Sequence, residues 1–566
     1  MGHFNFNGFF SLLLLLVCFL QEVDAQIIKS VSRVSVDSGG KGLRGKNINP
    51  NINEDGSVIA FTSFTSKLER NSSKRIEKPL VRFLNSGITQ SIAVNSDGEP
   101  ANDGRGDNSG NINFSSSKPS LNSDGTLVAF VSDASNLVSS DNNNFPDVYL
   151  RNFSENSTLR INVNDVNQEA TRGGFASQIS ANGKFVIFSS FSPNLSQDDT
   201  DEDQDVFVTN LESGEIEALP HPGFENGDGK LSGDGRYAVY GVCYSLKNCV
   251  ADVSSPFLYD RATKSLTELT PGFTEVSHQI SDDGNFVVIQ SRQAVNSPDT
   301  PAKKVGAQLH LYDVKQRTLS LISINGNSEI ASASTGLPDI SGDGRFITFF
   351  SAASDLVDND TNKQEDIFML DRDTGKVLRL NLTSSCKEVK KSEEKGIRLS
   401  QPVISANGKF VAFSTFDRLT TRPLEINGFS QKADTDRAAD VYVVEVDFDS
   451  EIPKFNPQST AASPFLALDC SGEILKLTFP DLKTDAQVFG RANSDNSLTR
   501  IVEIRRLGSK GQKSDIRRLR TKSNEIVIKN LKPGNFEVAY RNEVTTNNQT
   551  SMDNFSSLKS FTIVEN

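Results

Sequence analysis

Tryptophan is absent from this chain of 566 residues, which also has only four histidines and three methionines. So few histidines leave little material for His-rich metal sites or for histidine-based catalysis. The five cysteines form neither a C-x-x-C pair nor a zinc-type Cys/His spacing. Basic residues are outnumbered, with 59 Lys+Arg against 72 Asp+Glu. The resulting net charge of −13 disfavours nucleic acid or an anionic membrane as the main partner.

What the chain does contain is ordinary for a folded soluble protein, with 36% hydrophobic and 23% charged residues. Its length exceeds that of a single core, so we expect two or more domains. A 12-residue apolar run, Phe9 to Leu20, precedes the small residue Ala25. Such a run is typical of a signal peptide and too short to span a bilayer. We predict a signal peptide over 1–25, with a membrane anchor or a buried strand as the alternative.

The compartment follows from this prediction. No later stretch approaches the ~18 apolar residues of a spanning helix, so we expect an exported soluble protein without a transmembrane segment, periplasmic or secreted to the cell surface. An oxidising compartment favours disulfides between the four remaining cysteines. Cys243 and Cys249 are close enough in sequence to close a local loop. Cys386 and Cys470 would then join the last repeat to the tail, with two buried free thiols as an equal alternative.

One phrase recurs in seven copies along the chain. It reads Gln-Ile-Ser-Ala-Asn-Gly-Lys-Phe-Val-Ile-Phe-Ser-Ser at 178–190 and Asp-Ile-Ser-Gly-Asp-Gly-Arg-Phe-Ile-Thr-Phe-Phe-Ser at 339–351. Self-similarity of this kind predicts a repeat architecture. The spacing varies from copy to copy, so the insertions differ. The glycines of the seven copies are Gly56, Gly125, Gly183, Gly235, Gly284, Gly344 and Gly408.

Each copy predicts the same local structure. Asp-Gly or Asn-Gly between two apolar runs indicates a hairpin, because both central residues must tolerate a positive φ. The Phe-Val-x-Phe-x-Ser that follows has the composition of a buried strand. A polar loop leads to a third strand, such as the one beginning at Asp205, and a tight turn leads to a fourth, such as the one near Ile216. Four antiparallel strands in each of seven repeats predict a seven-bladed β-propeller over 27–447.

The two ends of this repeat region predict how the ring closes. The last copy supplies three strands, ending near Val446, and no fourth strand follows. Val31–Val36, ahead of the first hairpin, has the pattern of an isolated fourth strand. We expect it to pair as the outer strand of the last blade, because an open blade would leave an unpaired edge.

The repeat resembles a known family. The phrase Ile-Ser-x-Asp-Gly-x-Phe-Val-x-Phe-x-Ser, followed in one copy by Asp-Thr-Asn-x-x-x-Asp-Ile-Phe at 360–368, is similar to the TolB-type, WD-repeat-like propeller repeats of exported bacterial proteins. The resemblance covers roughly residues 30–447. It implies a propeller scaffold and, for TolB itself, contact with periplasmic proteins. It transfers no catalytic residue.

The tail has the pattern of a separate all-β module. Residues 448–464 read as a proline-punctuated linker. About seven short alternating runs over 465–566 predict a small β-sandwich. Asn530-Leu-Lys-Pro-Gly-Asn-Phe-Glu-Val-Ala-Tyr540 resembles the strand–turn–strand of fibronectin type III and related Ig-like domains. The expected fold is therefore an all-β chain with a seven-bladed propeller followed by this sandwich.

Four copies carry an acidic loop directly before the third strand. Ca²⁺ prefers several hard oxygen ligands, and alternating Asp and Asn residues can direct carboxylates toward one point. The alternative is that these short side chains hydrogen-bond their own backbone in Asx turns. The two loops that we favour as calcium sites contain Asp199, Asp201, Asp203 and Asp205, and Asp358, Asp360, Asn362 and Asp366. The other two contain Asp141, Asn143 and Asp147, and Asp434, Asp436 and Asp440.

No motif for nucleophilic or zinc chemistry accompanies the propeller. The tail lacks G-x-S-x-G, and His221, His278 and His310 occur in three different local contexts. We therefore expect an exported, non-enzymatic binding or assembly scaffold that uses one propeller face for a protein or a glycan. The alternative is a polysaccharide- or peptide-active hydrolase or lyase with a carboxylate or Ca²⁺ site in the central channel. Convergent acids or a His–acid cluster at one mouth of the channel would favour the enzyme.

Overall fold

A computed structural model describes residues 27–447 with internal breaks, together with the backbone of eight strands between Phe465 and Ile563. The breaks are 65–77, 103–117, 198, 200–202, 226–227, 244–254, 271–274, 293–305, 358–359, 363, 383–400, 417–418, 420–424, 427–428 and 431–437. The predicted signal peptide, the linker and Cys249, Cys386 and Cys470 lie outside the described residues.

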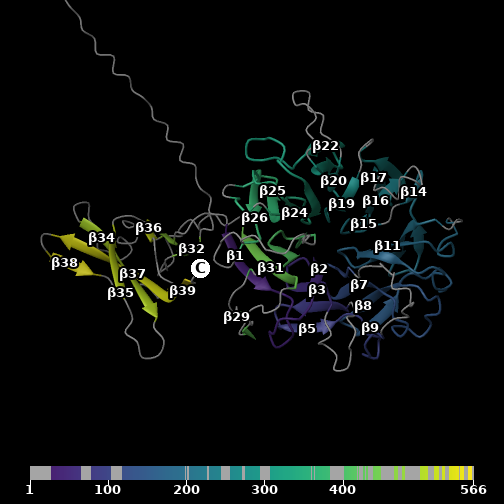
Figure 1. Ribbon diagram of the computed structural model, residues 1–566, viewed down its shortest axis with the longest axis horizontal. Helices are drawn as coiled ribbons and strands as arrows, with labels where there is room; N and C mark the ends of the chain where they lie inside the picture. Colours follow the sequence, from purple (N-terminus) through teal and green to yellow (C-terminus); the bar gives the residue numbers. More distant parts are fainter. Residues whose placement is uncertain are drawn as a thin grey trace, which may run out of the picture.

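Seven antiparallel sheets surround a common centre, as Figure 1 shows, and they form a seven-bladed β-propeller. In each sheet the strand that comes first in the repeat is innermost. Blade one contains β2 (Asn47–Ile52), β3 (Val58–Ser63), β4 (Lys78–Phe83) and β5 (Ile88–Ser91). Blade two contains β6 (Ser120–Leu121), β7 (Leu127–Ser132), β8 (Asp147–Asn152) and β9 (Ser157–Arg160). Blade three contains β10 (Phe175–Ile179), β11 (Phe185–Ser190), β12 (Asp205–Asn210) and β13 (Ile216–Ala218).

Blade four differs in that two short segments, β14 and β15, both pair with its second strand. A small hairpin, β29 (Glu425–Ile426) with β30 (Phe429–Ser430), follows β28 (Phe410–Thr415) in the chain. Blades four to seven contain β14 (Phe224–Glu225), β15 (Lys230–Leu231), β16 (Tyr237–Cys243), β17 (Ser255–Asp260) and β18 (Ser265–Glu268), then β19 (Glu275–Ile280), β20 (Phe286–Ser291), β21 (Gln308–Asp313) and β22 (Thr318–Leu321), then β23 (Thr335–Ile340), β24 (Phe346–Ser351), β25 (Asp366–Asp371) and β26 (Lys376–Arg379), then β27 (Val403–Ile404), β28 (Phe410–Thr415), β31 (Asp440–Asp447) and β1 (Ile27–Arg33).

The core of each blade explains the repeated aromatic residues. The second Phe of Phe-Val-x-Phe lies on the second strand, directly across from an aromatic residue on the third. Phe188 stacks on Phe207 with ring centroids 5.7 Å apart, and Phe349 stacks on Phe368 at 5.8 Å. All four rings are buried. Such cross-strand aromatic pairs stabilise a sheet, because each buries a large apolar area and fixes the register.

The repeated Gly of each hairpin joins one blade to the next. Gly344 has φ +73°, and a Cβ at this position would lie 2.3 Å from the ring of Phe286 in the preceding blade. The phrase Gly-x-Phe is therefore an interface motif, in which the glycine of one blade receives the aromatic residue of its neighbour. Similar contacts join Gly56 to Phe410, Gly235 to Phe185, Gly284 to Tyr237 and Gly408 to Phe346.

A closed circle of backbone hydrogen bonds links these hairpins. One bond of 2.8–3.3 Å crosses each of the seven blade interfaces, and the last returns to the first blade. We call the end of the propeller that carries the hairpins the bottom face. The donors and acceptors are Glu54 N to Ser123 O, Ser123 N to Ala181 O, Asn182 N to Gly233 O, Gly233 N to Asp282 O, Asp283 N to Gly342 O, Gly342 N to Ala406 O, and Asn407 N to Glu54 O.

The N-terminal strand closes the ring as predicted, with a shift in its bounds. β1 pairs antiparallel with β31, which places Val31 opposite Val444. The expected strand, Val31–Val36, is partly wrong, because pairing runs over Ile27–Arg33 and the chain then turns into a bridge between Val36 and Gly42. A buried ion pair, Arg33 Nη2 to Asp440 Oδ1 at 2.6 Å, joins the two ends of the propeller.

The described part of the tail consists of two antiparallel sheets. One has the order β32-β33-β36, and the other has β35-β34-β37-β38 with β39 also paired to β37. The strands are β32 (Phe465–Leu468), β33 (Leu475–Thr478), β34 (Ser497–Leu507), β35 (Ile516–Thr521), β36 (Glu525–Ile528), β37 (Gly534–Thr546), β38 (Gln549–Met552) and β39 (Lys559–Ile563). Throughout the described residues, no helix has the length and apolar character needed to cross a membrane.

Candidate functional site

The top face, opposite the hairpins, opens into a cavity of about 480 Å³ on the propeller axis, which we call the axial pocket. All seven innermost strands or the residues beside them contribute to its wall. Each blade places one side chain there from the same position of the repeat, the residue before Ile-Ser, Leu-Ser, Ile-Asn or Leu-Asn. These seven residues, which we call the axial ring, are Asn51, Ser120, Gln178, Lys230, Gln279, Asp339 and Val403.

The axial ring holds neighbouring blades together as well as lining the pocket. The amide oxygen of Gln178 accepts a hydrogen bond from the backbone N–H of Leu231 at 2.9 Å. The carboxylate of Asp339 accepts one from the N–H of Ile404, also at 2.9 Å. Asn51 Oδ1 accepts one from Leu121 N–H in the same way. These three side chains are therefore held in position without a ligand.

Irregular backbone shapes the wall of the axial pocket. The pairing register shifts within β2, β10 and β23 on the inner side of blades one, three and six. At each shift a residue other than glycine has a positive φ: Asn49 at 53°, Ala176 at 53° and Leu337 at 44°. All three line the pocket. Such a conformation costs about 1–3 kcal/mol, and strain of this kind clusters at ligand sites.

The charges of the axial pocket are few and unlike one another. Lys230 Nζ lies 2.5 Å from Asp228 Oδ1. Desolvation acts to raise the pKa of Asp228, but the ammonium groups of Lys230 and Lys118 outweigh it and hold that pKa below its usual range. Burial raises the pKa of Asp339 to about 7, although backbone N–H groups act in the opposite direction. The pocket therefore contains one ionised and one readily protonated carboxyl group.

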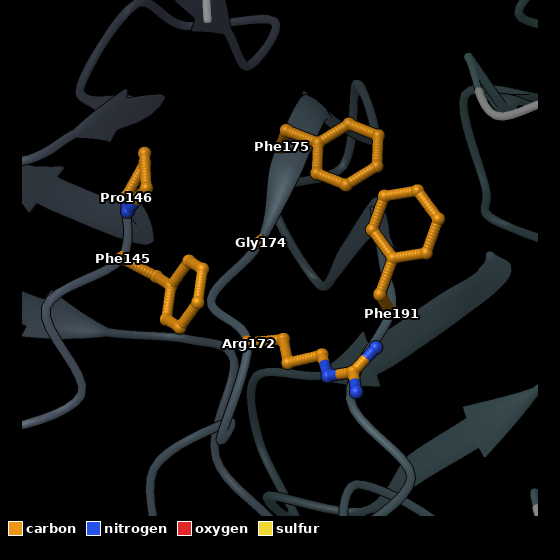
Figure 2. A pocket seen from close by; sticks show the side chains of 6 residues that line it. All are labelled: Phe145, Pro146, Arg172, Gly174, Phe175 and Phe191. Carbon is orange, nitrogen blue, oxygen red and sulfur yellow. The ribbon is translucent and has the colours of Figure 1, made fainter. Parts of the chain in front are cut away.

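A second cavity of about 410 Å³ lies on the top face between blades two and three, and we call it the side pocket. Figure 2 shows phenyl rings around it and the guanidinium group of Arg172 at its edge. Phe175 lines both cavities, so the side pocket adjoins the axial pocket. The residues that line the side pocket are Phe145, Pro146, Arg172, Gly174, Phe175 and Phe191.

The last aspartates of the two predicted calcium loops, Asp205 and Asp366, begin the third strands of their blades, as expected. A basic side chain lies beside each of them. In blade six, Arg379 Nη1 lies 3.3 Å from Asp360 Oδ1 and 3.5 Å from Asp366 Oδ2. In blade three, His221 Nε2 lies 3.0 Å from Asp205 Oδ1. None of these residues lines the axial pocket.

Two of the four acidic loops, in blades six and two, form Asx turns, which the sequence predicts as the alternative to calcium. Asn362 Oδ1 accepts a hydrogen bond from the backbone N–H of Gln364 at 2.8 Å. Asn143 Oδ1 accepts one from Phe145 N–H at 2.7 Å. Asp199 and Asp203 are described, whereas Asp201 and Asp358 lie outside the described residues. The calcium assignment of the loops in blades three and six therefore stays a prediction.

The remaining predicted candidates are placed only in part. Cys243 ends β16, and its proposed partner lies outside the described residues, so the disulfide stays a prediction. His278 Nε2 lies 3.0 Å from the carbonyl oxygen of Val239. Burial lowers the pKa of His310. Neither histidine lines the axial pocket, so the channel has no His–acid cluster among its described lining residues.

Sequence reasoning missed both pockets. The axial ring had a readable signal, because one position of the repeat varies from blade to blade while its neighbours keep their type. The side pocket had a weaker sequence signal, because its phenyl rings come from two blades and from segments far apart in the sequence.

Comparison with known proteins gives no family assignment. No family model matches the chain, and none of the curated proteins matches it significantly. Solved propellers are among its structural neighbours. TolB from Acinetobacter baumannii has 13% identity, and the match covers 59% of this chain and 65% of that one, with a TM-score of 0.31. The β-propeller domain of the Trilobed protease from Pyrococcus furiosus has 14% identity, 65% and 89% coverage and a TM-score of 0.41. Oligogalacturonate lyase in complex with manganese has 11% identity, and the match covers 71% of this chain and 90% of that one, with a TM-score of 0.40.

Proposed function

We propose that this protein is an exported, non-enzymatic binding scaffold that recognises a protein or a glycan with the top face of its propeller. The observation that carries this proposal is the axial ring, in which seven blades of common design present seven side chains of mixed character. Amide, hydroxyl, ammonium, carboxyl and apolar groups around one cavity suit recognition of a specific polar ligand.

Pre-organisation supports binding as the task of this face. Gln178 and Asp339 of the axial ring already accept backbone hydrogen bonds from neighbouring blades, so a ligand would not have to order these two side chains. The positive φ of Leu337, a residue without the conformational freedom of glycine, keeps an irregular strand edge directed at the cavity. The strained backbone of this wall lowers the stability of the fold, and strain of this kind is typical of ligand-binding sites.

The test combines capture of ligands from envelope and secreted fractions with a glycan array, using two matched variants. Gln279→Trp places a large side chain in the axial pocket, and Gln316→Trp makes the same change on an exposed turn of the bottom face. We expect a ligand that binds the native chain and Gln316→Trp equally but loses at least ten-fold affinity for Gln279→Trp. A ligand that tolerates Gln279→Trp would disprove recognition at the axis.

A second candidate function rests on the two carboxyl groups of the axial pocket. Asp228 is ionised because its pKa is depressed, whereas Asp339, with a pKa of about 7, can hold and donate a proton. One ionised and one protonated carboxyl group in the same pocket are the two states that acid-assisted hydrolysis uses. A polysaccharide- or peptide-active hydrolase or lyase would use such a pair. Product release from envelope polysaccharides or peptides that disappears in Asp339→Asn would establish this alternative and replace the scaffold proposal.

For the parts of the chain outside the propeller, we infer the organisation that the sequence predicts. A cleaved signal peptide directs export, and a linker leads from the propeller to a tail domain of fibronectin type III or Ig-like type. The two antiparallel sheets of the tail support the sandwich. N-terminal sequencing of the protein secreted by its own host tests the first point, with Gln26 expected as the new first residue.

A further inference from the structure

The side pocket combines exposed phenyl rings with one cationic group. Phe145 is 41% exposed and Phe191 is 37% exposed, which is unusual for large apolar side chains on a propeller with fully buried blade cores. Phe175 and Phe191 face each other with ring centroids 5.6 Å apart and an angle of 33° between their planes. The rings surround an open space, as Figure 2 shows, and the guanidinium group of Arg172 lies below Phe191.

The walls of the side pocket are held by contacts that leave little freedom. Gly173 has φ +67°, and a Cβ there would lie 2.1 Å from the carbonyl oxygen of Pro146. The backbone N–H of Gly174 donates a 2.8 Å hydrogen bond to that same oxygen. Ser190 Oγ donates to the carbonyl oxygen of Gly173 at 2.5 Å, and the N–H of Arg172 donates to Ser192 Oγ at 2.8 Å. The Gly-Gly segment thereby ties the loops that carry Phe145 and Phe191 into one rigid unit.

The chemistry of the lining selects one kind of ligand. A sugar ring needs several hydrogen-bond donors and acceptors, whereas the only polar side chain among the six lining residues is Arg172. A cationic group would meet the positive charge of that guanidinium, which works against an aromatic cage for ammonium ions. An apolar group with a carboxylate close to it fits both features, because phenyl rings bury the apolar part and a guanidinium group binds carboxylates with several N–H donors.

We propose that the side pocket binds a peptide segment of a protein partner that presents a large apolar side chain beside a carboxylate. The apolar side chain enters between Phe145, Phe175 and Phe191, and the carboxylate binds Arg172. This inference rests on the proposed function, since it names the partner class for the same top face. Aromatic rings in a rigid pocket next to an arginine are the typical anchor points of protein interfaces.

The test uses small probes and the full-length chain. We would titrate N-acetyl-phenylalanine, its neutral analogue N-acetyl-phenylalaninamide, octanoate and a methyl glucoside, and follow binding by ligand-observed NMR. N-acetyl-phenylalanine should bind at millimolar concentration and at least five-fold more tightly than the amide. Phe191→Ala should weaken both phenylalanine probes at least five-fold. Arg172→Gln should abolish the preference for the carboxylate while leaving the amide unchanged.

Leu159→Ala is the matched control, because Leu159 is 56% exposed on blade two and does not line the pocket. It should bind like the native chain. No saturable binding of N-acetyl-phenylalanine at millimolar concentration, or tighter binding of octanoate or the glucoside, would overturn the peptide assignment. Since Gln279→Trp fills the axial pocket and alters no residue of the side pocket, a loss of ligand in that variant reports on the proposed function alone.

Discussion

The bottom and top faces of the propeller use the same repeat in opposite ways. On the bottom face, each copy repeats the same Asp-Gly or Asn-Gly hairpin, and the hairpins join in a closed circle of backbone hydrogen bonds. On the top face, the axial ring changes from amide to ammonium to carboxyl to apolar around the axis. Positions that stay constant between blades hold the propeller together, and positions that vary between blades are free to serve recognition.

A group of buried aspartates that recurs in four of the seven blades lies at the top end of the propeller and has a structural role. The third strands of blades two, three, six and seven all begin with a buried aspartate, and each of these has a basic partner. The pairs are Asp147 with Arg160, Asp205 with His221, Asp366 with Arg379, and Asp440 with Arg33. Recurrence in several blades together with a basic partner, more than position on a face, therefore marks these aspartates as structural residues.

The largest effect is expected where one of these pairs closes the propeller. The side chains of Asp440 and Arg33 are 1% and 3% exposed, and Asp440 Oδ1 also accepts a hydrogen bond from Ser35 Oγ at 2.6 Å. Removing one member of a buried ion pair costs about 3–5 kcal/mol, because the other charge stays buried. Asp440→Ala should lower the free energy of unfolding by that amount, as measured by chemical denaturation.

Asp373→Ala is the control for this variant, since Asp373 is 72% exposed and lies 3.4 Å from Arg345 Nε. An exposed ion pair contributes about 0–1 kcal/mol. Equal losses in the two variants would show that the strand supplied by the N-terminus does not depend on its buried charge.

The next effect tests the hairpin glycines. Gly344→Ala introduces a Cβ 2.3 Å from the Phe286 ring at φ +73°, whereas Gly375→Ala in the same blade introduces one at φ +71° with nothing within 4 Å. Both variants bear the cost of a left-handed backbone, about 1–2 kcal/mol. Only Gly344→Ala adds overpacking, about 1–3 kcal/mol more. Denaturation curves of the two variants should therefore differ, and identical midpoints would remove the interface role of Gly344.

The sequence predicted the blades well because their signals are local. A hairpin needs only Asp-Gly between two apolar runs. The third strand has its own local pattern, an Asp followed by β-branched and aromatic residues, as at Asp147 and Asp366. The end strand was predicted from the edge that the last blade would otherwise expose, although its bounds were too late by several residues. The pockets were not predicted, because Phe145 and Phe191 meet only after two blades pack together. The pKa of Asp339 likewise depends on burial that no single repeat contains.

A smaller effect concerns the one carboxyl group of the axial ring. The folded-state pKa of Asp339 is about 7, above the ordinary value of 3.8, so the folded state holds its proton more tightly than the unfolded state. Its contribution is therefore lost as pH rises from about 4 to 7. Asp339→Asn removes this titration and keeps an oxygen for the N–H of Ile404. The melting temperature of the variant relative to the native chain should rise between pH 4 and pH 8. A constant difference would contradict the buried state of this carboxyl group.

The smallest expected effect concerns calcium and compares the acidic loops of blades three and six. In blade six, Arg379 already lies beside Asp360 and Asp366, whereas the loop of blade three places Asp199, Asp201, Asp203 and Asp205 within seven residues. We expect a metal to favour blade three, because crowded carboxylates repel one another unless a cation neutralises them. A ligand at ten times its Kd stabilises the folded state by about 1.4 kcal/mol, so calcium at millimolar concentration should raise the melting temperature by a few degrees at most. The double change Asp201→Asn and Asp203→Asn should abolish that rise, and Asp360→Asn should not. If calorimetry detects no calcium binding, the acidic loops hold no metal and the Asx-turn alternative replaces the calcium prediction. If Asp360→Asn alone abolishes binding, the calcium site lies in blade six and the choice of blade three is wrong.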